Sequence, residues 1–573
     1  MNSPSLTLLQ KKSLTSSFPP ETIHIVALIV VAFAVVAPMT FWGVPSALDL
    51  SNHFRFALPF YDALRSGQLY PGWLAESNHG FGDASFRFYP PALYYLLSAF
   101  RVVTGNWYVA MVSTFGTLSV LGAAGMYLWA REFTSSVIAM WAAIFYAVAP
   151  YHINELYQAL LLAEFAGAAI LPFAFLFAER VCRYRRTRDI AGLASAYALL
   201  ILTHLPLAVI GSVALACYCL LRIDRKKFLA TMGRLVVAVV LGLAASSCYW
   251  VTMISELNWI RADNVNPEPG VGYRDNFVLS TLSPEHVNVW WMNILLASML
   301  AMFWPALILI TSTARPQLPK LNEHASLAGP KAATLLLLIL SLFMATPLSR
   351  PIWNLVHPLQ ETQFPWRWFV ITSLAGPLLL ALAVPFWISF INTRKRPLFI
   401  FACGTIAISL AFSMGQIIRE ARWLTPAQFE QLLSSIPGTM SVYQWMPVWA
   451  HARPEMKAAA EAGDRDIKIE SWTPEKRVFH VGTGNADDAR VRTFFYPLWV
   501  ATAAGQVLAT RPDDEGALLI ALPRQPADIT LEFREPARTR YAAGLTAMGW
   551  ACIAGLFLSS RRRISRNPLS PAS

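Results

Sequence analysis

The sequence IHIVALIVVAFAVVAPMTFWGVPSALDLSNHFRF, from Ile23 to Phe56, joins a long apolar run to a polar segment. The apolar run, 23–42, has about the 20 residues that a helix needs to cross a bilayer. It lacks a small-residue cleavage pattern, so we predict a retained membrane helix and not a removable signal peptide. The polar segment opens a loop, 43–107, which is rich in aromatic residues, glycine and proline. We expect this loop to lie outside the membrane.

Asp49 and His53 lie four residues apart, just after the apolar run. Residues with this spacing share one face of a helix. A carboxylate and an imidazole so placed can act as a general base and its partner, or as two ligands of a divalent cation such as Mg²⁺ or Mn²⁺. The pattern is also typical of an interfacial loop, in which the aspartate caps a helix and aromatic side chains lie at the headgroup level.

The composition of the chain is that of a polytopic membrane protein. Of its 573 residues, 55% are hydrophobic and 14% are charged, which is unlike a large soluble enzyme. The formal net charge is +12, and basic residues gather in short clusters between apolar runs, at 180–188, 222–227, 394–396 and 561–566. Such clusters are typical of the cytoplasmic side of a membrane. We therefore predict no nucleic-acid partner.

Windows of about 20 apolar residues predict twelve membrane helices. They lie near 23–42, 108–130, 135–150, 156–179, 189–204, 206–222, 231–254, 289–312, 332–347, 366–390, 397–414 and 541–559. The short apolar run 90–103 contains Arg101 and is predicted to be an interfacial helix. With twelve spans and a cytoplasmic N-terminus, every basic cluster lies in the cytoplasm, which the positive-inside rule favours.

This topology divides the chain into four parts: a cytoplasmic tail (1–22), a transmembrane domain (23–414), an extracytoplasmic domain (415–540), and a final helix with a basic cytoplasmic tail (541–573). The third part opens with a helical pattern, TPAQFEQLLSSI, and continues with alternating segments such as DIKIESW and DITLEFRE. Alternation of this kind predicts strands. The fold class is therefore an all-α polytopic membrane protein with a small, mostly-β extracytoplasmic domain near its C-terminus.

Several polar and aromatic side chains are predicted to lie at the outer membrane edge or inside the membrane, where ionisable groups are costly and tend to be functional. They are Glu155, Glu164, His204, Gln363, Arg367 and Trp368. Structural alternatives exist, since Glu164 can join two helices, His204 can end a helix and Arg367 can anchor the interface. All of these residues map to the same side as Asp49 and His53.

The order of motifs resembles that of the GT-C superfamily of membrane glycosyltransferases. The matching features are Asp49 in the first outer loop, the G-x-L-x-P-x-W segment Gly67–Trp73, and Tyr89-Pro90-Pro91. The chain is more similar still to bacterial multispanning proteins described as 6-pyruvoyl-tetrahydropterin-synthase-related. That resemblance covers nearly the whole chain and rests on D-L-x-x-H (49–53), P-Y-H-I-x-x-L-Y (150–157), A-E (163–164), Q-F-P-W-R (363–367), Y-x-W-x-P (443–447) and F-Y-P-x-W (495–499).

The GT-C resemblance implies a polyprenyl-phosphate sugar as donor and an acidic residue of the first outer loop at the catalytic centre. By position, Asp49 becomes the candidate base or metal-organising carboxylate, and Glu155 resembles a second acidic position on the next outer turn. Many members of the superfamily carry paired acids in the first loop, whereas the nearest partner of Asp49 is His53. A requirement for a divalent cation held by Asp49, His53 and Glu155 is therefore open.

Glycosyl transfer from a lipid phosphate needs a base for the acceptor proton and a cation for the leaving phosphate. Arginine suits the phosphate because its planar fork binds oxyanions in a bidentate way. We therefore expect Arg367 at the phosphate, with Arg350 or Arg87 in reserve. The full set of expected substrate-binding residues is Arg367, Gln363, Trp368, Glu164, His204, Arg87 and Trp73. The tryptophans can stack on sugar rings or anchor the interface.

These observations predict a multi-pass glycosyltransferase of the bacterial cytoplasmic membrane, with both termini in the cytoplasm and its active site on the outer, periplasmic face. The expected partners are a polyprenyl-phosphate-linked sugar donor, an envelope glycan, lipid or protein acceptor, and membrane lipids. A lipid or polysaccharide transporter explains the spans equally well, although the sequence lacks the two-half repeat common in transporters. A non-catalytic scaffold with a glycan-binding outer domain is a further alternative.

Overall fold

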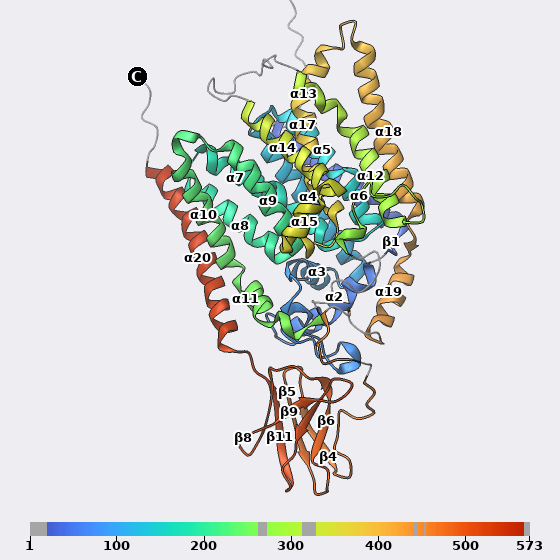
Figure 1. Ribbon diagram of the computed structural model, residues 1–573, viewed down its shortest axis with the longest axis vertical. Coiled ribbons are helices and arrows are strands. Elements are labelled where there is room, and N and C mark those ends of the chain that lie inside the picture. The colour runs from blue at the N-terminus through green and yellow to red at the C-terminus, as the bar shows by residue number, and fades with distance from the viewer. Residues whose placement is uncertain are drawn as a thin grey trace, which may run out of the picture.

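The computed structural model describes residues 20–47, 49–184, 186–261, 272–311, 328–438, 442, 445–451 and 454–566. Figure 1 shows a large helical bundle with a β domain projecting from one end. The C-terminal end of helix α20 (Ala537–Arg566) lies at the opposite end. The predicted tail 1–22 lies mostly outside the described residues, since α1 begins at Pro20. The predicted fold class is confirmed.

The bundle consists of long apolar helices and a few short ones. They are α1 (Pro20–Trp42), α4 (Trp107–Arg131), α5 (Ser136–Ala147), α6 (Pro150–Tyr157), α7 (Leu162–Tyr184), α8 (Thr187–Thr203), α9 (Leu205–Arg222), α10 (Phe228–Ala245), α11 (Ser247–Glu256), α12 (Val287–Phe303), α13 (Ile308–Thr311), α14 (Ala328–Ala345), α15 (Arg350–Leu355), α16 (His357–Gln360), α17 (Phe369–Ser389), α18 (Arg396–Glu420) and α20. Among the described residues, 10 helices are long and apolar enough to cross a membrane, or 11 if one bent pair counts as a span.

The twelve predicted spans are close to the 10 or 11 candidate spans of the described residues, and two of the predicted windows account for the difference. Each predicted window falls on helical residues, but α8 has only 17 residues and is not one of the membrane-crossing helices. The window 332–347 belongs to the bent pair, in which Gly329–Ala345 and Pro347–Leu355 meet at 87°. Pro347 explains the bend, because proline cannot continue a helix and pushes the preceding residue to an extended conformation. Thr346 is extended, with ψ of 161°.

The segment 151–156 was predicted to be an outer turn and is instead a buried helix. Together α5 and α6 form one span, Ser136–Tyr157, and every residue of α6 is buried. The chain reverses after α6, where Leu160 adopts a left-handed conformation with φ of 50°. As a result, the side chains of His152 and Glu155 lie inside the bundle.

The first loop, 43–107, contains two helices between the bundle and the β domain, α2 (Leu50–Arg65) and α3 (Ala92–Thr104). One side of α2 is buried, through residues such as Phe54 and Phe60. The 13-residue α3 agrees with the predicted interfacial helix, since it is too short to cross a membrane. A short antiparallel pair, β1 (Val44–Pro45) with β2 (Trp423–Leu424), ties this loop to the segment before α19 (Pro426–Ser435).

The β domain consists of two antiparallel sheets. Their strands are β3 (Ala460–Glu461), β4 (Ile467–Trp472), β5 (Lys476–Val481), β6 (Asp488–Phe494), β7 (Trp499–Ala503), β8 (Gln506–Leu508), β9 (Thr510–Pro512), β10 (Ala517–Ala521) and β11 (Ala527–Phe533). The sheet orders are β3-β6-β10-β9 and β4-β5-β11-β7-β8. Residues of the first loop, including Trp73 and Phe81, complete the apolar core of this domain. The first loop and the β domain therefore pack as neighbours.

Candidate functional site

Asp49 precedes the first turn of α2, and its side chain makes no capping hydrogen bond to that helix. The carboxylate is partly exposed, and its Oδ1 accepts a hydrogen bond from the Asn52 amide at 3.3 Å. Its charge acts on His53, Tyr89 and Tyr94. The Asp49 carboxylate therefore makes few contacts that stabilise the fold. A general base needs a carboxylate that is available to the substrate in this way.

His53 points into the protein, where its Nδ1 lies 2.9 Å from the hydroxyl of Tyr94. Burial lowers the pKa of His53, while the nearby Asp49 and a hydrogen bond to the backbone of Leu160 oppose this effect. The imidazole is therefore neutral near pH 7. No hydrogen bond joins the Asp49 and His53 side chains, which are both described. His53 is better suited to orienting the start of α2 than to relaying a proton from Asp49.

Arg367 and Glu164 form a buried ion pair inside the bundle. Arg367 Nε lies 2.9 Å from Glu164 Oε2, and Arg367 Nη1 donates to the carbonyl of Thr362 at 2.6 Å. The other oxygen of Glu164 accepts a hydrogen bond from the Tyr151 hydroxyl at 2.8 Å. The remaining nitrogen, Nη2, has no hydrogen-bond partner among the described residues. The guanidinium is therefore fixed in place with one donor group free.

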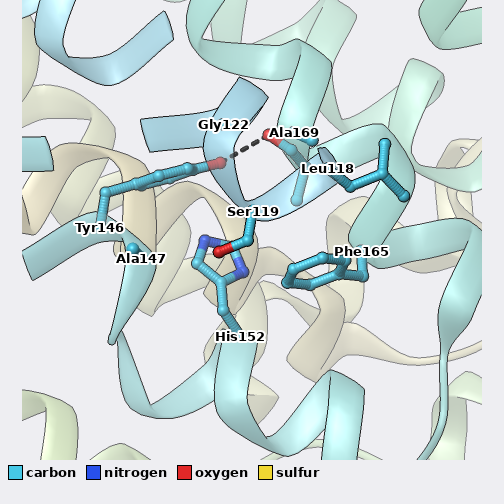
Figure 2. Close-up of a pocket in the computed structure, with 9 residues that line it drawn as sticks. Leu118, Ser119, Gly122, Tyr146, Ala147, His152, Phe165 and Ala169 are labelled. Atoms are coloured by element: carbon cyan, nitrogen blue, oxygen red, sulfur yellow. Dashed lines mark hydrogen bonds between the residues drawn. The ribbon is translucent and has the colours of Figure 1, made fainter. Parts of the chain in front are cut away.

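His152 and Glu155 form a second buried pair, with 2.7 Å between Nδ1 and Oε2. The other side of the imidazole faces a cavity of about 10 Å³, which is the size of a single water. Figure 2 shows the His152 ring in this cavity beside the Ser119 hydroxyl. Ser119 Oγ, His152 Nε2 and Glu155 Oε1 are all buried, and none has a hydrogen-bond partner in the part of the chain that the structure describes. One water in the cavity would satisfy Ser119 and His152 together.

The residues of the first loop and of the bundle meet around Tyr89 and His204. The charges of Asp49, Arg367 and Glu164 all act on Tyr89, although burial is the main reason that its pKa is raised. His204 caps α9, where its ring accepts from the backbone of Leu207 at 3.3 Å. Burial lowers the pKa of His204, and both Arg367 and His53 lower it further.

The structure thus places six of the predicted residues in one region, which we call the polar cluster. Its members are Asp49, His53, Glu155, Glu164, His204 and Arg367. Sequence reasoning gave no role to Tyr89, Tyr151 or His152, which hold this cluster together. The motifs Y-P-P and P-Y-H-I contained all three residues, but a motif does not say which side chain faces the others.

Arg87 does not belong to the polar cluster. Its guanidinium lies 2.5 Å from Glu256 of α11 and 2.5 Å from Glu535, which follows the last strand of the β domain. Glu256 also accepts hydrogen bonds from Arg538 at 2.9 Å and Tyr496 at 2.8 Å. Glu256 and Glu535 accept the hydrogen bonds of the Arg87 guanidinium, and a substrate phosphate would need the same donor groups. Arg87 therefore joins the first loop, the bundle and the β domain, and its predicted binding of a phosphate stays a prediction.

The two predicted stacking residues are also engaged elsewhere. Trp73 is fully buried, with ring centroids 5.4 Å from Phe533 and 5.7 Å from Trp499. Trp368 is fully buried in the bundle core. Neither indole presents a face to a sugar. Gln363 is half-buried in a left-handed turn with φ of 62°, and it precedes the segment that carries Arg367.

The predicted metal ligands do not form a cation site. Among the residues that the structure describes, there is no group of three or more His, Cys, Asp or Glu side chains placed to hold a metal ion. His53 is bonded to Tyr94 and Glu155 to His152, so two of the three proposed ligands already have other partners. The arrangement therefore does not fit a cation held by Asp49, His53 and Glu155.

The sequence signature of a family described as "6-pyruvoyl-tetrahydropterin synthase related domain; membrane protein" matches residues 86–417, more than half of the chain. No curated protein sequence matches.

Solved structures with similar folds include three glycosyltransferases, and this chain covers only part of the first. The arabinofuranosyltransferase AftD from Mycobacteria is 16% identical with a TM-score of 0.42, over 70% of this chain and 27% of that one. ArnT from Cupriavidus metallidurans bound to undecaprenyl phosphate is 12% identical with a TM-score of 0.40, over 73% and 74%. The arabinosyltransferase EmbB from Mycobacterium smegmatis is 11% identical with a TM-score of 0.39, over 91% and 64%.

Proposed function

The chain belongs to the 6-pyruvoyl-tetrahydropterin-synthase-related family of membrane proteins, and we propose that it is a membrane glycosyltransferase. In this proposal it moves a sugar from a polyprenyl-phosphate donor to an envelope acceptor. The observation that carries the proposal is the polar cluster, in which the partly exposed carboxylate of Asp49 and the guanidinium of Arg367 both act electrostatically on Tyr89. Arg367 is held by Glu164 and Thr362, and its Nη2 has no hydrogen-bond partner among the described residues. The order of motifs along the sequence supports the same assignment.

Asp49 is the proposed base. The acceptor hydroxyl gives its proton to the carboxylate while its oxygen bonds to the anomeric carbon of the donor sugar. The bond between that carbon and the phosphate oxygen breaks, and the polyprenyl phosphate leaves with the electron pair. A single displacement of this kind inverts the configuration at the sugar carbon. Only one carboxylate is required, because the leaving phosphate needs no proton at neutral pH.

Arg367 is the proposed phosphate-binding residue. Glu164 and Thr362 occupy Nε and Nη1, which prevents the side chain from moving when a substrate binds. The free Nη2 group then donates to a phosphate oxygen, and this bond strengthens as charge develops on the leaving group. The charges of Arg367 and Asp49 both act on Tyr89, so the phosphate-binding group and the base lie near the same tyrosine.

No step of this proposal uses a divalent cation, because the predicted ligands do not fit one. Asp49 Oδ2 has no hydrogen bond among the described residues, whereas His53 and Glu155 are hydrogen-bonded to Tyr94 and His152. The reaction therefore rests on the protein groups alone: Asp49 removes the acceptor proton, and Arg367 stabilises the phosphate.

We propose that the reaction takes place on the outer face of a bacterial cytoplasmic membrane. The basic cluster after α9 and the C-terminal end of α20 lie at the end of the bundle away from the β domain (Figure 1). Basic residues favour the cytoplasmic side, which supports an outer position for the first loop, the β domain and the polar cluster. Both chain ends then lie in the cytoplasm.

A lipid transporter is the second candidate, and one observation favours it. The pair Gly329–Ala345 and Pro347–Leu355 is a span broken by 87°, and broken spans are common at the substrate sites of transporters. A transporter, however, has no use for a general base. Replacement of Asp49 separates the two candidates.

The experiment is release of polyprenyl phosphate from labelled undecaprenyl-phosphate sugars by the full-length protein in nanodiscs. Asp49→Asn should reduce release by about 10²–10⁴-fold, the usual contribution of a general base, without lowering the unfolding temperature. Asp514→Asn, which removes the same charge from an exposed site of the β domain, is the matched control. Equal release by wild type and Asp49→Asn would exclude Asp49 as the base. If the wild-type protein releases no polyprenyl phosphate from any donor but moves labelled lipid between leaflets, the protein is a transporter.

A further inference from the structure

A cleft lies beside α2, along its residues 55–62. Its volume is about 60 Å³, against about 10 Å³ for the cavity beside His152, and it is partly open to solvent. Its charged residues are Arg55 and Asp62 of α2 and Glu76 of the first loop, and its apolar wall includes Leu58, Pro59 and Ile436. A concave site with an apolar wall and a few polar groups is typical of ligand binding.

Hydrogen bonds connect this cleft to the proposed base. Arg55 Nη1 donates to Asn52 Oδ1 at 2.8 Å, and Asn52 Nδ2 donates to Asp49 Oδ1 at 3.3 Å. Asn52, Arg55 and Asp62 share one face of α2, because their spacing follows the helical period. At 1.5 Å per residue, Arg55 lies about 9 Å and Asp62 about 20 Å along the helix axis from Asp49. A ligand that fills the cleft and also reaches Asp49 is longer than one sugar ring.

Two polar groups in the cleft have no hydrogen-bond partner among the described residues. The Asp62 carboxylate makes no hydrogen bond or ion pair with the described residues. Burial raises the pKa of Asp62, with Arg65 opposing and Glu76 adding to this effect. Ser77 Oγ, which also lines the cleft, is buried without a hydrogen-bond partner. Asp62 is exposed and is open to a ligand, whereas an unpaired buried group such as Ser77 Oγ is costly. A hydrogen-bonding ligand in the cleft could pair with both.

The charge of the cleft selects among ligands. Two carboxylates, Asp62 and Glu76, and one guanidinium, Arg55, line the cleft. Arg65 and Arg101 act on Asp62 from outside this lining, so the lining itself disfavours a phosphate or a uronate. Hydroxyl and amino groups are donors that suit carboxylates, while the wall of Leu58 and Pro59 suits the C–H face of a sugar. The donor phosphate therefore has its place at Arg367 and not in this cleft.

We infer that this cleft binds the acceptor, an oligosaccharide whose sugars carry hydroxyl or amino groups and no acidic group in the cleft. That the bound oligosaccharide is the acceptor rests on the proposed function; that the cleft binds carbohydrate does not. In this arrangement the terminal sugar reaches Asp49, and the preceding sugars lie along Arg55 and Asp62.

Binding is tested with three trisaccharides of equal length but different charge: glucosamine trimer, maltotriose and trigalacturonate. Saturation-transfer NMR on the full chain in nanodiscs should find the glucosamine trimer tightest and trigalacturonate at least about tenfold weaker, because charge-assisted hydrogen bonds are the strong ones. In the variant Asp62→Asn/Glu76→Gln, the affinity difference between the three trisaccharides should disappear. The control Asp514→Asn/Glu285→Gln removes the same charge from exposed sites and should keep it. Tightest binding of trigalacturonate, no binding of any trisaccharide, or an unchanged order in Asp62→Asn/Glu76→Gln would overturn the inference.

Activity measurements distinguish acceptor binding in the cleft from donor chemistry in the polar cluster. With wild type active, Asp62→Asn/Glu76→Gln should raise the KM for an oligosaccharide acceptor about tenfold and leave release of polyprenyl phosphate to water unchanged. Equal loss of both activities would show that these residues act on the donor, which contradicts the assignment. If the trisaccharides bind in the predicted order but no sugar is transferred, the cleft stands as a carbohydrate site and the proposed function fails.

Discussion

Two buried arginines, Arg87 and Arg367, differ in how many of their guanidinium nitrogens are paired. Arg87 forms ion pairs with Glu256 and Glu535. Glu256 also forms an ion pair with Arg538 and accepts a hydrogen bond from Tyr496. Arg367 has one carboxylate, Glu164, and one backbone carbonyl. In the first network every nitrogen of the Arg87 guanidinium is paired, and Arg538 Nε is the atom without a partner among the described residues. The second has a free guanidinium nitrogen.

The difference separates a structural role from a binding role. A buried charge is costly unless it is paired and hydrogen-bonded, so a fully paired guanidinium is stable without a ligand and gains nothing from one. The Arg87 network accordingly joins three parts of the fold. The polar cluster and the adjoining His152 retain groups without a partner among the described residues, including Glu155 Oε1 and His152 Nε2, and these are the positions where a substrate or a water can add a hydrogen bond.

Breaking the Arg87 network should give the largest effect on stability. Arg87→Met leaves Glu256 and Glu535 without their shared partner, and loss of one member of a buried pair costs about 3–5 kcal/mol. We expect lower unfolding temperature and faster proteolysis between the bundle and the β domain. Lys476→Met, on the exposed side of the same domain, is the control. A stable, protease-resistant Arg87→Met protein would contradict the structural role.

Weakening the Arg367 network should lower activity more than it lowers stability. Arg367→Lys keeps the charge near Glu164 but loses the planar fork. We expect release of polyprenyl phosphate to fall by about 10–100-fold, which corresponds to one or two charge-assisted hydrogen bonds, with a smaller shift in unfolding temperature than in Arg87→Met. Full activity in Arg367→Lys would argue that another residue binds the phosphate.

Acid should release the β domain before it affects the bundle. Burial opposes ionisation of Glu256, but the hydrogen bonds from Arg87 and others outweigh it and lower the pKa of Glu256 below its usual 4.5. A lowered pKa contributes stability above 4.5, and that stability is lost as the pH falls through the folded-state value. Limited proteolysis from pH 7 to pH 3 should therefore show cleavage near the β domain only below about pH 4.5. In Glu256→Gln this pH dependence should be weaker; an identical profile would refute the role of Glu256.

The smallest predicted effect concerns the cavity beside His152. Ser119→Ala removes one of the two groups that a single water would join, and loss of a neutral hydrogen bond costs about 0.5–1.5 kcal/mol. We expect a slight fall in unfolding temperature and an activity change of less than tenfold. His152→Gln, which disturbs the contact with Glu155 itself, should cost more. The reverse order would mean that the cavity holds no water.

The sequence predicted the architecture well because its signals are local. Apolar runs of about 20 residues identify membrane helices, and alternation in DIKIESW and DITLEFRE matches β4 and β11. The error at 151–156 has a physical reason. Polar residues in this segment suggested a turn, whereas the structure buries His152 and Glu155 as a pair inside the bundle, where each compensates the other.

The roles of individual residues were harder to predict because they depend on distant partners. Arg87 meets residues 169 and 448 positions away in the sequence, and nothing near Arg87 indicates them. Trp73 likewise becomes part of the β-domain core. Asp49, Glu164 and Arg367 could be grouped from the sequence because topology placed all three on one side of the membrane. Topology cannot tell a free guanidinium from a paired one.

The most direct test of this account is a cryo-EM structure of the protein in nanodiscs with undecaprenyl phosphate. The account predicts phosphate density within hydrogen-bond distance, about 3 Å, of Arg367 Nη2, with the Arg87 network unchanged. Phosphate bound at Arg87, or Glu256 and Glu535 displaced from Arg87 to admit it, would contradict the distinction between the two networks and with it the proposed site.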